Sequence, residues 1–413
     1  MSFADVLIVG GGHGGAQAAL ALRQRGFEGR ITIATREAHP PYERPPLSKD
    51  YLAGERPFEK ILIRPESFWA ERKIDIRTRT AVVAIDPQAR SAELGDGSTL
   101  DYHTLIWAAG GDPRRLPCDG ADLDGVHSIR TRGDVDRIRA QLGGGVKHVA
   151  VIGGGYIGLE AAAVFRKLGL PVTVIEREDR VLSRVAGPDL SGFYEAEHQR
   201  QGVELLLGHN VECLLGDDQG RVRAVAIESG DGNRSEVEAD LVIAGIGIVP
   251  AVGPLLAAGA AGTNGVDVDD FCRTTLDDTY AIGDCAAHSN PYADNRVIRL
   301  ESVQNATDMA NTVAKHITGE PEAYNTVPWF WSNQYDLRLQ TVGFSRDDDD
   351  TVLRGDPDSR SFSIVYLREG RVVALDCVNA TRDYAQGRRL IEARSEPDLE
   401  ALADPEVALK SLI

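Results

Sequence analysis

The stretch Val6-Leu7-Ile8-Val9-Gly10-Gly11-Gly12-His13-Gly14-Gly15 decides the fold of this 413-residue chain. Its apolar run predicts a strand buried on both faces of a parallel sheet, and its glycines follow the spacing G-x-G-x-x-G. Such glycines allow a tight turn and bring the backbone close to a pyrophosphate, which the free N–H groups of the following helix stabilise. We therefore expect this segment to bind a dinucleotide.

The pattern occurs a second time, at Val149-Ala150-Val151-Ile152-Gly153-Gly154-Gly155-Tyr156-Ile157-Gly158. Each copy continues into a helix and a second apolar strand, as a Rossmann βαβ unit requires. Two such units in one chain predict two bound dinucleotides, with electrons passing between them. The expected elements are strands at residues 6–9, 31–34, 149–152 and 172–175, and helices at 15–25 and 157–168.

The two copies differ at the residue that follows the second strand. In the second copy this residue is Glu176, whose carboxylate can accept hydrogen bonds from ribose hydroxyls and would repel a 2′-phosphate. The second site should therefore prefer NADH to NADPH, although Arg177 and Arg180 could soften that preference. In the first copy Thr35 takes this place, and Glu37 could still reach a ribose.

Composition narrows the class of protein. The chain length predicts two or three domains. The net charge of −18 and the pI of about 5.0 argue against binding to nucleic acid or anionic membranes. The uncharged stretch 241–262 is rich in glycine and interrupted by proline, so we expect a buried strand, a loop and a short helix there, not a membrane span. The N-terminus shows no leader pattern, which predicts a cytoplasmic protein.

The cysteines show no C-x-x-C or other ligand spacing; they are Cys118, Cys213, Cys272, Cys285 and Cys377. This distribution predicts reduced thiols and no zinc, iron–sulfur or other metal site in the chain. Any metal cluster that the chain serves must therefore belong to another protein. A flavin disulfide reductase needs a redox cysteine pair just after the first glycine turn, and no cysteine precedes Cys118.

Six further segments are distinctive: PYERPPLSK at 41–49, GGGYIGLE at 153–160, GIGIVP at 245–250, YAIGDCA at 280–286, LESVQNA at 300–306 and PWFWSNQY at 328–335. In these segments the chain resembles the FAD-dependent, NADH-using ferredoxin reductases of bacterial oxygenase systems, of the putidaredoxin reductase type. The resemblance extends over essentially the whole chain. Two departures from the family pattern are Ala109 in place of a threonine and Arg36 in place of a frequent acid.

The resemblance implies that the first glycine turn holds FAD and the second NADH. Together with the motifs, it places at FAD the residues Gly10, Gly12, Gly14, Gly15, Glu37, Arg44, Lys49, Val82, Arg130, Asp284, Glu301, Val303 and Trp331. It places at NADH the residues Gly153, Gly155, Tyr156, Ile157, Gly158, Glu160, Glu176 and Gly247.

Three of these residues have particular implied roles. Asp284 would hydrogen-bond the ribityl chain of FAD, and it could at the same time cap the helix that follows. Lys49 would lie near the flavin and pair with Glu160, because an ammonium stabilises an anionic reduced flavin and a buried lysine needs a partner. Taken alone, Lys49 would be an ordinary surface lysine. Trp331 would lie beside the flavin, and core packing is compatible with that place.

These features predict an α/β fold of the glutathione-reductase type, with two Rossmann-like domains and a small α+β C-terminal domain. The predicted domains are an FAD-binding domain at 1–113 and 243–322, an NADH-binding domain at 114–242, and a C-terminal domain at 323–413. The FAD-binding domain is discontinuous because Asp284 must reach the FAD held by Gly12. In the C-terminal domain, alternation predicts antiparallel strands at 361–367 and 371–376, and the acidic run 347–350 predicts a solvated loop.

The expected activity is that of a ferredoxin–NAD(+) reductase: NADH reduces FAD, which passes single electrons to a 2Fe-2S ferredoxin. That ferredoxin would feed a cytochrome P-450 type monooxygenase or an aromatic-ring dioxygenase. Rubredoxin or monodehydroascorbate reductases differ only in acceptor, and a signalling flavoprotein like apoptosis-inducing factor remains a further alternative. We expect a monomer or weak dimer. Because ferredoxins are acidic, we also expect a basic docking surface, with Arg64, Arg72, Lys73 and Lys410 as candidates.

Overall fold

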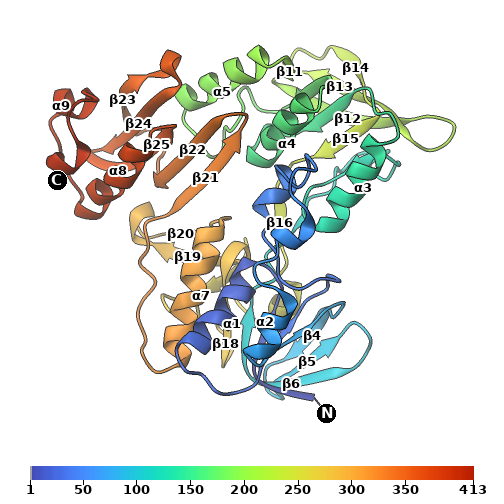
Figure 1. The fold of residues 1–413 in the computed structure, drawn as a ribbon, viewed down its shortest axis with the longest axis vertical. Coiled ribbons are helices and arrows are strands. Elements are labelled where there is room, and N and C mark those ends of the chain that lie inside the picture. Colours follow the sequence, from blue (N-terminus) through green and yellow to red (C-terminus); the bar gives the residue numbers. More distant parts are fainter. Residues whose placement is uncertain (1) are drawn as a thin grey trace. The chain divides into compact units, whose positions relative to one another are not determined.

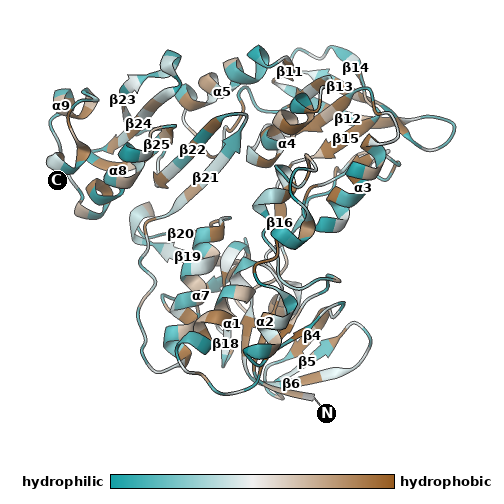
Figure 2. Ribbon diagram, viewed as in Figure 1, coloured by the Kyte–Doolittle hydropathy of each residue, from teal (hydrophilic) through white to brown (hydrophobic). Residues whose placement is uncertain are grey.

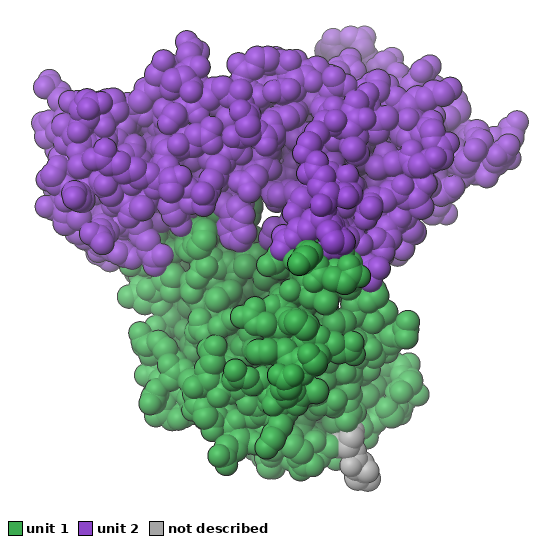
Figure 3. All heavy atoms as spheres, in the orientation of Figure 1, with its two compact units in different colours: residues 1–44, 58–112, 249–330 green, residues 45–57, 113–248, 331–413 purple. Residues whose placement is uncertain are grey.

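The computed structural model describes residues 2–413, which form two compact units (Figure 3). Unit 1 comprises residues up to 44 together with 58–112 and 249–330. Unit 2 comprises residues 45–57, 113–248 and 331–413. Each unit therefore collects three separate stretches of the chain. The predicted division into three domains stays a prediction.

Unit 1 is built on a sheet in the order β3-β2-β1-β6-β5-β4, with β18 paired to β6 (Figure 1). Its strands are β1 Ser2–Val9, β2 Ile31–Ala34, β3 Ile74–Arg77, β4 Val82–Asp86, β5 Ser91–Leu94, β6 Thr99–Trp107 and β18 Thr279–Ala281. The core strand β1 is parallel to both β2 and β6, and β18 is parallel to β6. The late strand β18 thus returns the chain to the first sheet, as the predicted discontinuity requires.

Helices of unit 1 cover this sheet through small side chains. Helix α1, His13–Gln24, buries Ala16, Ala18 and Ala19, which let it lie close to the strands. Helix α7, Val303–Ile317, packs beside α1, and the Gln17 side chain donates a hydrogen bond to Asn311 at 2.9 Å. The remaining elements are α2 Glu66–Glu71, β16 Ile248–Pro250, α6 Gly253–Ala257, and a small sheet of β17 Val266–Val268, β19 Ala286–Asn290 and β20 Arg296–Ile298.

Unit 2 contains a parallel sheet in the order β11-β10-β9-β15-β8. Its strands are β8 Val126–His127, β9 Val149–Ile152, β10 Val172–Ile175, β11 Val203–Leu206 and β15 Leu241–Ala244, and its helices are α3 Arg132–Leu142, α4 Tyr156–Lys167 and α5 Pro188–Arg200. Strand β15 is apolar along its length (Figure 2). A second sheet is antiparallel and consists of β12 His209–Gly216, β13 Val222–Ser229 and β14 Arg234–Glu238.

The C-terminal part of unit 2 is a five-stranded sheet in the order β21-β22-β25-β24-β23. Its elements are β21 Trp329–Gln334, β22 Leu337–Gly343, β23 Asp350–Asp356, β24 Ser361–Arg368 and β25 Arg371–Val378, followed by α8 Thr381–Ala393 and α9 Leu399–Ala403. The neighbouring pairs β22–β25, β25–β24 and β24–β23 are antiparallel. This confirms the two strands expected from the alternation of apolar residues.

The predicted elements around both glycine turns are confirmed, with one systematic difference. Both helices begin earlier than expected, at His13 and Tyr156, because Gly12 and Gly155 take the N-cap position. The uncharged stretch 241–262 contains the expected strand and short helix, but residues 248–250 of the expected loop form a further short strand, β16. No helix within residues 2–413 combines the length and apolar character needed to cross a membrane.

The prediction of a solvated loop at residues 347–350 is partly wrong. Asp347 and Asp348 are exposed. The Asp349 side chain is only 1% exposed, because it forms an ion pair with Arg368 at 2.7 Å and accepts a hydrogen bond from the Arg346 N–H. Asp350 already belongs to β23. A charge run indicates solvent exposure only where no buried partner is available.

Candidate dinucleotide sites

The first glycine turn has the geometry of a close-approach site. Gly10 has φ +117°, and a side chain there would collide with the backbone of Ala108. A side chain on Gly15 would collide with the Gly10 carbonyl, so this glycine keeps α1 against β1. In contrast, a Cβ on Gly12 would meet nothing within 4 Å, which leaves open space at the helix N-terminus. The buried Gly14 faces Ile282 and Ala306.

The second glycine turn repeats these contacts residue by residue. Gly153 has φ +105° and would collide with the Gly245 carbonyl if it carried a side chain. Gly158 stands against the Gly153 carbonyl as Gly15 stands against Gly10. Gly155, the N-cap of α4, again faces open space. Both helix N-termini therefore present free N–H groups to open space. Such a site can bind the negatively charged pyrophosphate of a dinucleotide.

The acid at the end of β10 lies against its own glycine turn. The Glu176 carboxylate accepts a hydrogen bond from the Gly154 N–H at 2.6 Å and one from the Glu178 N–H at 2.9 Å. Thr35 occupies the matching place beside Gly11 in unit 1. The first site therefore lacks an acid at this position, and the second has one held by the backbone.

The two arginines that follow Glu176 form hydrogen bonds and ion pairs with other residues. Arg180 donates to the carbonyls of Ala186 and Ser183 at 2.6 and 3.0 Å, and to the Ser191 hydroxyl at 2.8 Å. Arg177 is exposed and pairs with Glu178 at 2.7 Å. The arginines that could soften the discrimination against a 2′-phosphate thus have other partners.

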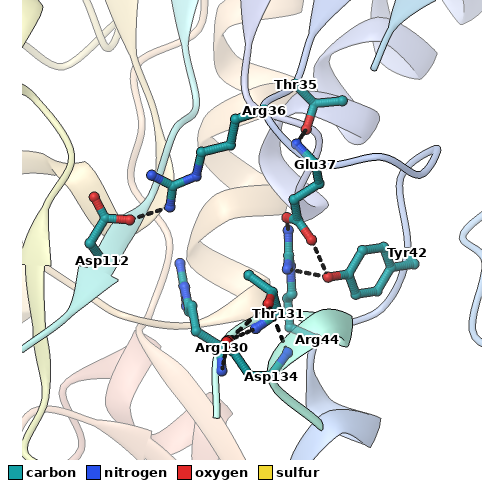
Figure 4. A network of polar contacts seen from close by, with 9 residues as sticks. All are labelled: Thr35, Arg36, Glu37, Tyr42, Arg44, Asp112, Arg130, Thr131 and Asp134. Carbon is teal, nitrogen blue, oxygen red and sulfur yellow. Dashed lines mark hydrogen bonds and ion pairs between the residues drawn. The ribbon is translucent and has the colours of Figure 1, made fainter. Parts of the chain in front are cut away.

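Arg44 and Glu37 form a half-buried ion pair in unit 1 (Figure 4). The second carboxylate oxygen of Glu37 accepts a hydrogen bond from the Tyr42 hydroxyl, which also accepts one from Arg44 at 2.6 Å. Burial raises the pKa of Glu37, but the Arg44 charge and the Arg44 and Tyr42 hydrogen bonds outweigh it and hold this pKa below its ordinary value. Arg36 turns away to pair with Asp112.

Lys49 and Glu160 form an ion pair inside unit 2. The Lys49 ammonium lies 2.6 Å from the Glu160 carboxylate, and the two side chains are 18% and 1% exposed. Ser48 donates to the same carboxylate oxygen at 2.5 Å, and Ser332 donates to the other at 2.7 Å. Glu160 lies on α4, two residues after Gly158, so the second glycine turn and this ion pair share one helix.

The other residues implied by the resemblance are distributed over both units. Asp284 is partly buried in a short turn after β18, and its carbonyl accepts a hydrogen bond from Arg299 at 2.8 Å. Glu301, 44% exposed at its side chain, pairs with Arg299 at 2.8 Å. Val303 begins α7 and Val82 begins β4.

In unit 2, Trp331 is a half-buried residue of β21. The Arg130 N–H donates to Asp134 at 3.3 Å (Figure 4). Tyr156 is the first residue of α4, and Ile157 is 43% exposed. Gly247 has φ +91°.

Sequence reasoning missed several polar side chains near these residues. Ser48 and Ser332 contact Glu160 although neither carries a motif of its own, and only the alternation of Ser332 and Gln334 on an aromatic strand hints at a buried polar face. The guanidinium groups of Arg114 and Arg184 both lie within 4 Å of the Cβ position of Gly247. Within residues 2–413 no cluster of histidine, cysteine or acidic side chains is arranged to hold a metal ion.

Comparison with known proteins matches the chain over its length. The family described as pyridine nucleotide-disulphide oxidoreductase matches residues 4–310, and a reductase C-terminal domain matches residues 329–413. A ferredoxin reductase subunit of 5,5′-dehydrodivanillate O-demethylase from Sphingobium sp. is 54% identical over 99% of this chain and 98% of its own. Putidaredoxin reductase CamA from Pseudomonas putida is 38% identical over 99% and 96%.

Solved structures of ferredoxin reductases also match the chain over nearly its whole length. The covalent putidaredoxin reductase–putidaredoxin complex superposes with a TM-score of 0.93 at 37% identity, covering 100% of this chain and 98% of that one. The ferredoxin reductase for the CYP199A2 system from Rhodopseudomonas palustris also gives a TM-score of 0.93, at 36% identity, covering 98% of this chain and 99% of that one.

Proposed function

Because the chain belongs to the pyridine nucleotide-disulphide oxidoreductase family, and within it to the FAD- and NAD(P)H-dependent ferredoxin reductases, we propose that it carries electrons from NADH to a 2Fe-2S ferredoxin of a bacterial oxygenase system. The observation that carries the choice of NADH is the placement of Glu176 at the second glycine turn and a threonine at the first. We further propose that the protein is cytoplasmic.

The residues of each glycine turn fit a dinucleotide. Gly12 and Gly155 leave open space at a helix N-terminus, and Gly10, Gly15, Gly153 and Gly158 could not carry side chains without collision. When bound, FAD supplies the chemistry that joins a two-electron donor to a one-electron acceptor. The protein supplies placement: Gly10, Gly12 and the N-terminus of α1 would hold its pyrophosphate.

Lys49 and Glu160 are proposed to serve the reacting end of the site. Glu160 neutralises the lysine and holds its ammonium in one place, since a buried charge needs a partner. Lys49 would then present a fixed positive charge where negative charge develops on reduction. None of the steps proposed here requires a proton to leave either side chain.

Glu176 is proposed to bind the adenosine ribose of NADH. Its oxygens keep acceptor capacity beyond the two backbone hydrogen bonds, and ribose hydroxyls are suitable donors. A phosphate on the same ribose would meet this carboxylate without Arg180, which is bound to backbone carbonyls. The site therefore favours NADH.

A disulfide-reductase activity finds no support in the thiols. Cys272, Cys285 and Cys377 are buried, and Cys118 and Cys213 are half-buried in unit 2. Burial raises the pKa of Cys285 to about 12, so this thiol stays protonated and is a poor nucleophile. The acceptor is therefore proposed to be a partner protein.

The test is reconstitution with the full chain. The purified protein is expected to take up FAD with a flavin absorbance spectrum and to reduce cytochrome c with NADH only when a 2Fe-2S ferredoxin is added. Rubredoxin serves as a parallel acceptor, because a rubredoxin-NAD(+) reductase from Pseudomonas putida is 36% identical over 91% of this chain. Failure to take up FAD, or turnover with rubredoxin alone, would contradict the proposal.

A further inference from the structure

Glu160 is the end of a chain of buried hydrogen bonds that extends far beyond its contact with Lys49. Ser332 donates to Glu160 at 2.7 Å, and Gln334 donates to Ser332 at 3.3 Å. The other end of the Gln334 amide lies 2.8 Å from His198 on α5, whose second ring nitrogen is 3.0 Å from the Tyr335 hydroxyl. All of these residues belong to unit 2.

Four members of this series of hydrogen bonds are buried. The exposed fractions of Glu160, His198, Ser332 and Gln334 are all 2% or less. Ser332 and Gln334 alternate on β21, so both side chains point to the same face of that strand. A buried polar side chain is costly unless each of its groups finds a partner, and here the partners are one another.

The hydrogen bonds have a single direction, which the carboxylate sets. An ionised carboxylate only accepts, so the Ser332 hydroxyl must donate to it and accept from the Gln334 amide N–H. The Gln334 carbonyl oxygen then accepts from His198 Nε2–H, and His198 Nδ1 accepts from Tyr335. Burial lowers the pKa of His198 to about 4, although its hydrogen bond to Gln334 opposes this shift; the ring is therefore neutral and suited to one donor and one acceptor role.

The result for Glu160 is a carboxylate fixed at both oxygens. One oxygen accepts from Ser332, and the other accepts from Ser48 and Lys49. Donor chains that point the same way polarise one another, so each member strengthens the hydrogen bond that reaches the charge. Without the Ser332 link, the carboxylate could rotate about its last bond and the Lys49 ammonium would follow it.

We propose that Ser332, Gln334 and His198 are positioning residues that hold the Glu160 carboxylate in its orientation toward Lys49 and so maintain the affinity of the second site for the nicotinamide dinucleotide. The inference rests on the proposed function, which assigns Glu160 to that site. It adds residues from β21 and α5 that no glycine motif includes.

The test compares two buried serines in the FAD-loaded full chain. Ser332→Ala removes the donor to Glu160, and Ser363→Ala is the matched control, since Ser363 is also fully buried and donates to a carboxylate, Asp383, at 3.1 Å. Both variants should lower the melting temperature to a similar extent. Only Ser332→Ala should raise the Kd for NAD⁺, measured by calorimetry, on the order of tenfold, because Glu160 then no longer has its orientation fixed before the dinucleotide binds.

Tyr335→Phe provides a second variant that keeps the ring and removes only the far end of the chain. It should weaken NAD⁺ binding in the same direction by about two- to threefold, a smaller effect because Ser332 still holds Glu160 directly. Unchanged NAD⁺ affinity in both Ser332→Ala and Tyr335→Phe would overturn the inference. Wild-type protein that binds FAD and reduces ferredoxin while the variants behave like the control would refute this inference alone. Wild-type protein that does neither would refute the proposed function.

Discussion

At the scale of single residues, Asp376 is the most unusual acid in unit 2. It is 5% exposed on β25, and its carboxyl group accepts a hydrogen bond from the Tyr366 hydroxyl at 2.7 Å. Burial raises the pKa of Asp376 to about 7, and the Tyr366 hydrogen bond only partly opposes this shift. The side chain is therefore protonated in the folded protein under mildly acidic conditions and must ionise inside the core at higher pH.

This raised pKa gives a pH-dependent stability prediction. Between pH 4 and 7 the unfolded chain loses the Asp376 proton while the folded chain keeps it, so stability falls as pH rises. Asp376→Asn should therefore change the free energy of unfolding more favourably at pH 8 than at pH 5, by about 2–3 kcal/mol. Denaturant unfolding at the two pH values measures this difference. Asp358→Asn, an exposed control, should show no such difference.

The choice of nicotinamide cofactor is a second prediction at this scale. Glu176→Gln removes the negative charge that would face a 2′-phosphate, and it should raise kcat/KM for NADPH relative to NADH on the order of tenfold. Steady-state kinetics with both cofactors measures the ratio. Glu178→Gln is the matched control, because Glu178 is a near neighbour that pairs with Arg177. An unchanged ratio in Glu176→Gln would remove this residue from the discrimination.

Residues of the site were predictable to different degrees. Glu176 and the glycines could be found from the sequence because their positions follow directly from the turn that binds a pyrophosphate. The ion pair of Lys49 and Glu160 depended on the resemblance, since 111 residues separate them. Ser332 and His198 were not predictable, because their importance comes from tertiary contacts that leave no local pattern.

At the scale of elements, the two glycine turns allow a paired experiment. Gly12→Ala and Gly155→Ala should both fold normally, since each Cβ would meet open space and neither position has positive φ. Gly12→Ala should weaken FAD binding on the order of 100-fold, about 2.7 kcal/mol, because the methyl group blocks close backbone approach. Gly155→Ala should retain FAD and raise KM for NADH instead.

A control for this pair comes from another helix. Gly192 lies within α5, and its Cβ would also meet nothing within 4 Å. Gly192→Ala should leave both cofactor affinities unchanged, as measured by FAD fluorescence titration and NADH kinetics. Loss of FAD from Gly155→Ala, or its retention in Gly12→Ala, would reverse the assignment of the two turns.

Elements were more predictable than their limits. Strands β2, β9 and β10 begin and end at the residues expected, because each is a short run of apolar and β-branched residues, a composition typical of buried strands. The starts of α1 and α4 were placed too late, since a glycine N-cap gives no side-chain signal. The return of the chain to the first sheet through β18 was predicted from the requirement that Asp284 reach the FAD, and not from any local pattern.

At the scale of the whole molecule, the net negative charge disfavours binding of an acidic ferredoxin unless a local basic surface attracts it. The chain carries a net charge of −18, and an acidic ferredoxin would be repelled on average. Arg64, Arg72 and Lys73 are exposed around α2, and the two guanidinium groups lie 5.6 and 5.2 Å from the Phe68 ring. This cluster is the candidate docking surface.

The expected signature is a ferredoxin reduction rate that falls as salt increases, because screening weakens a local attraction. Reversing the charges of Arg64, Arg72 and Lys73 together should lower the rate at low salt on the order of tenfold and invert the salt dependence, because screening then weakens a repulsion. Stopped-flow measurements from low to high salt test this, with Arg389→Glu on α8 as the control. A rate that rises with salt in the wild type would show that net charge dominates.

The burial of the cysteine thiols affects how readily the protein is oxidised. Hydrogen peroxide oxidises a cysteine most readily when its thiol is exposed and ionised. Cys272, Cys285 and Cys377 are buried, and burial also raises the pKa of Cys118, so these thiols stay in the protonated form that peroxide attacks slowly. Placing Cys272, Cys285 and Cys377 in the interior thus limits the oxidation of these three thiols.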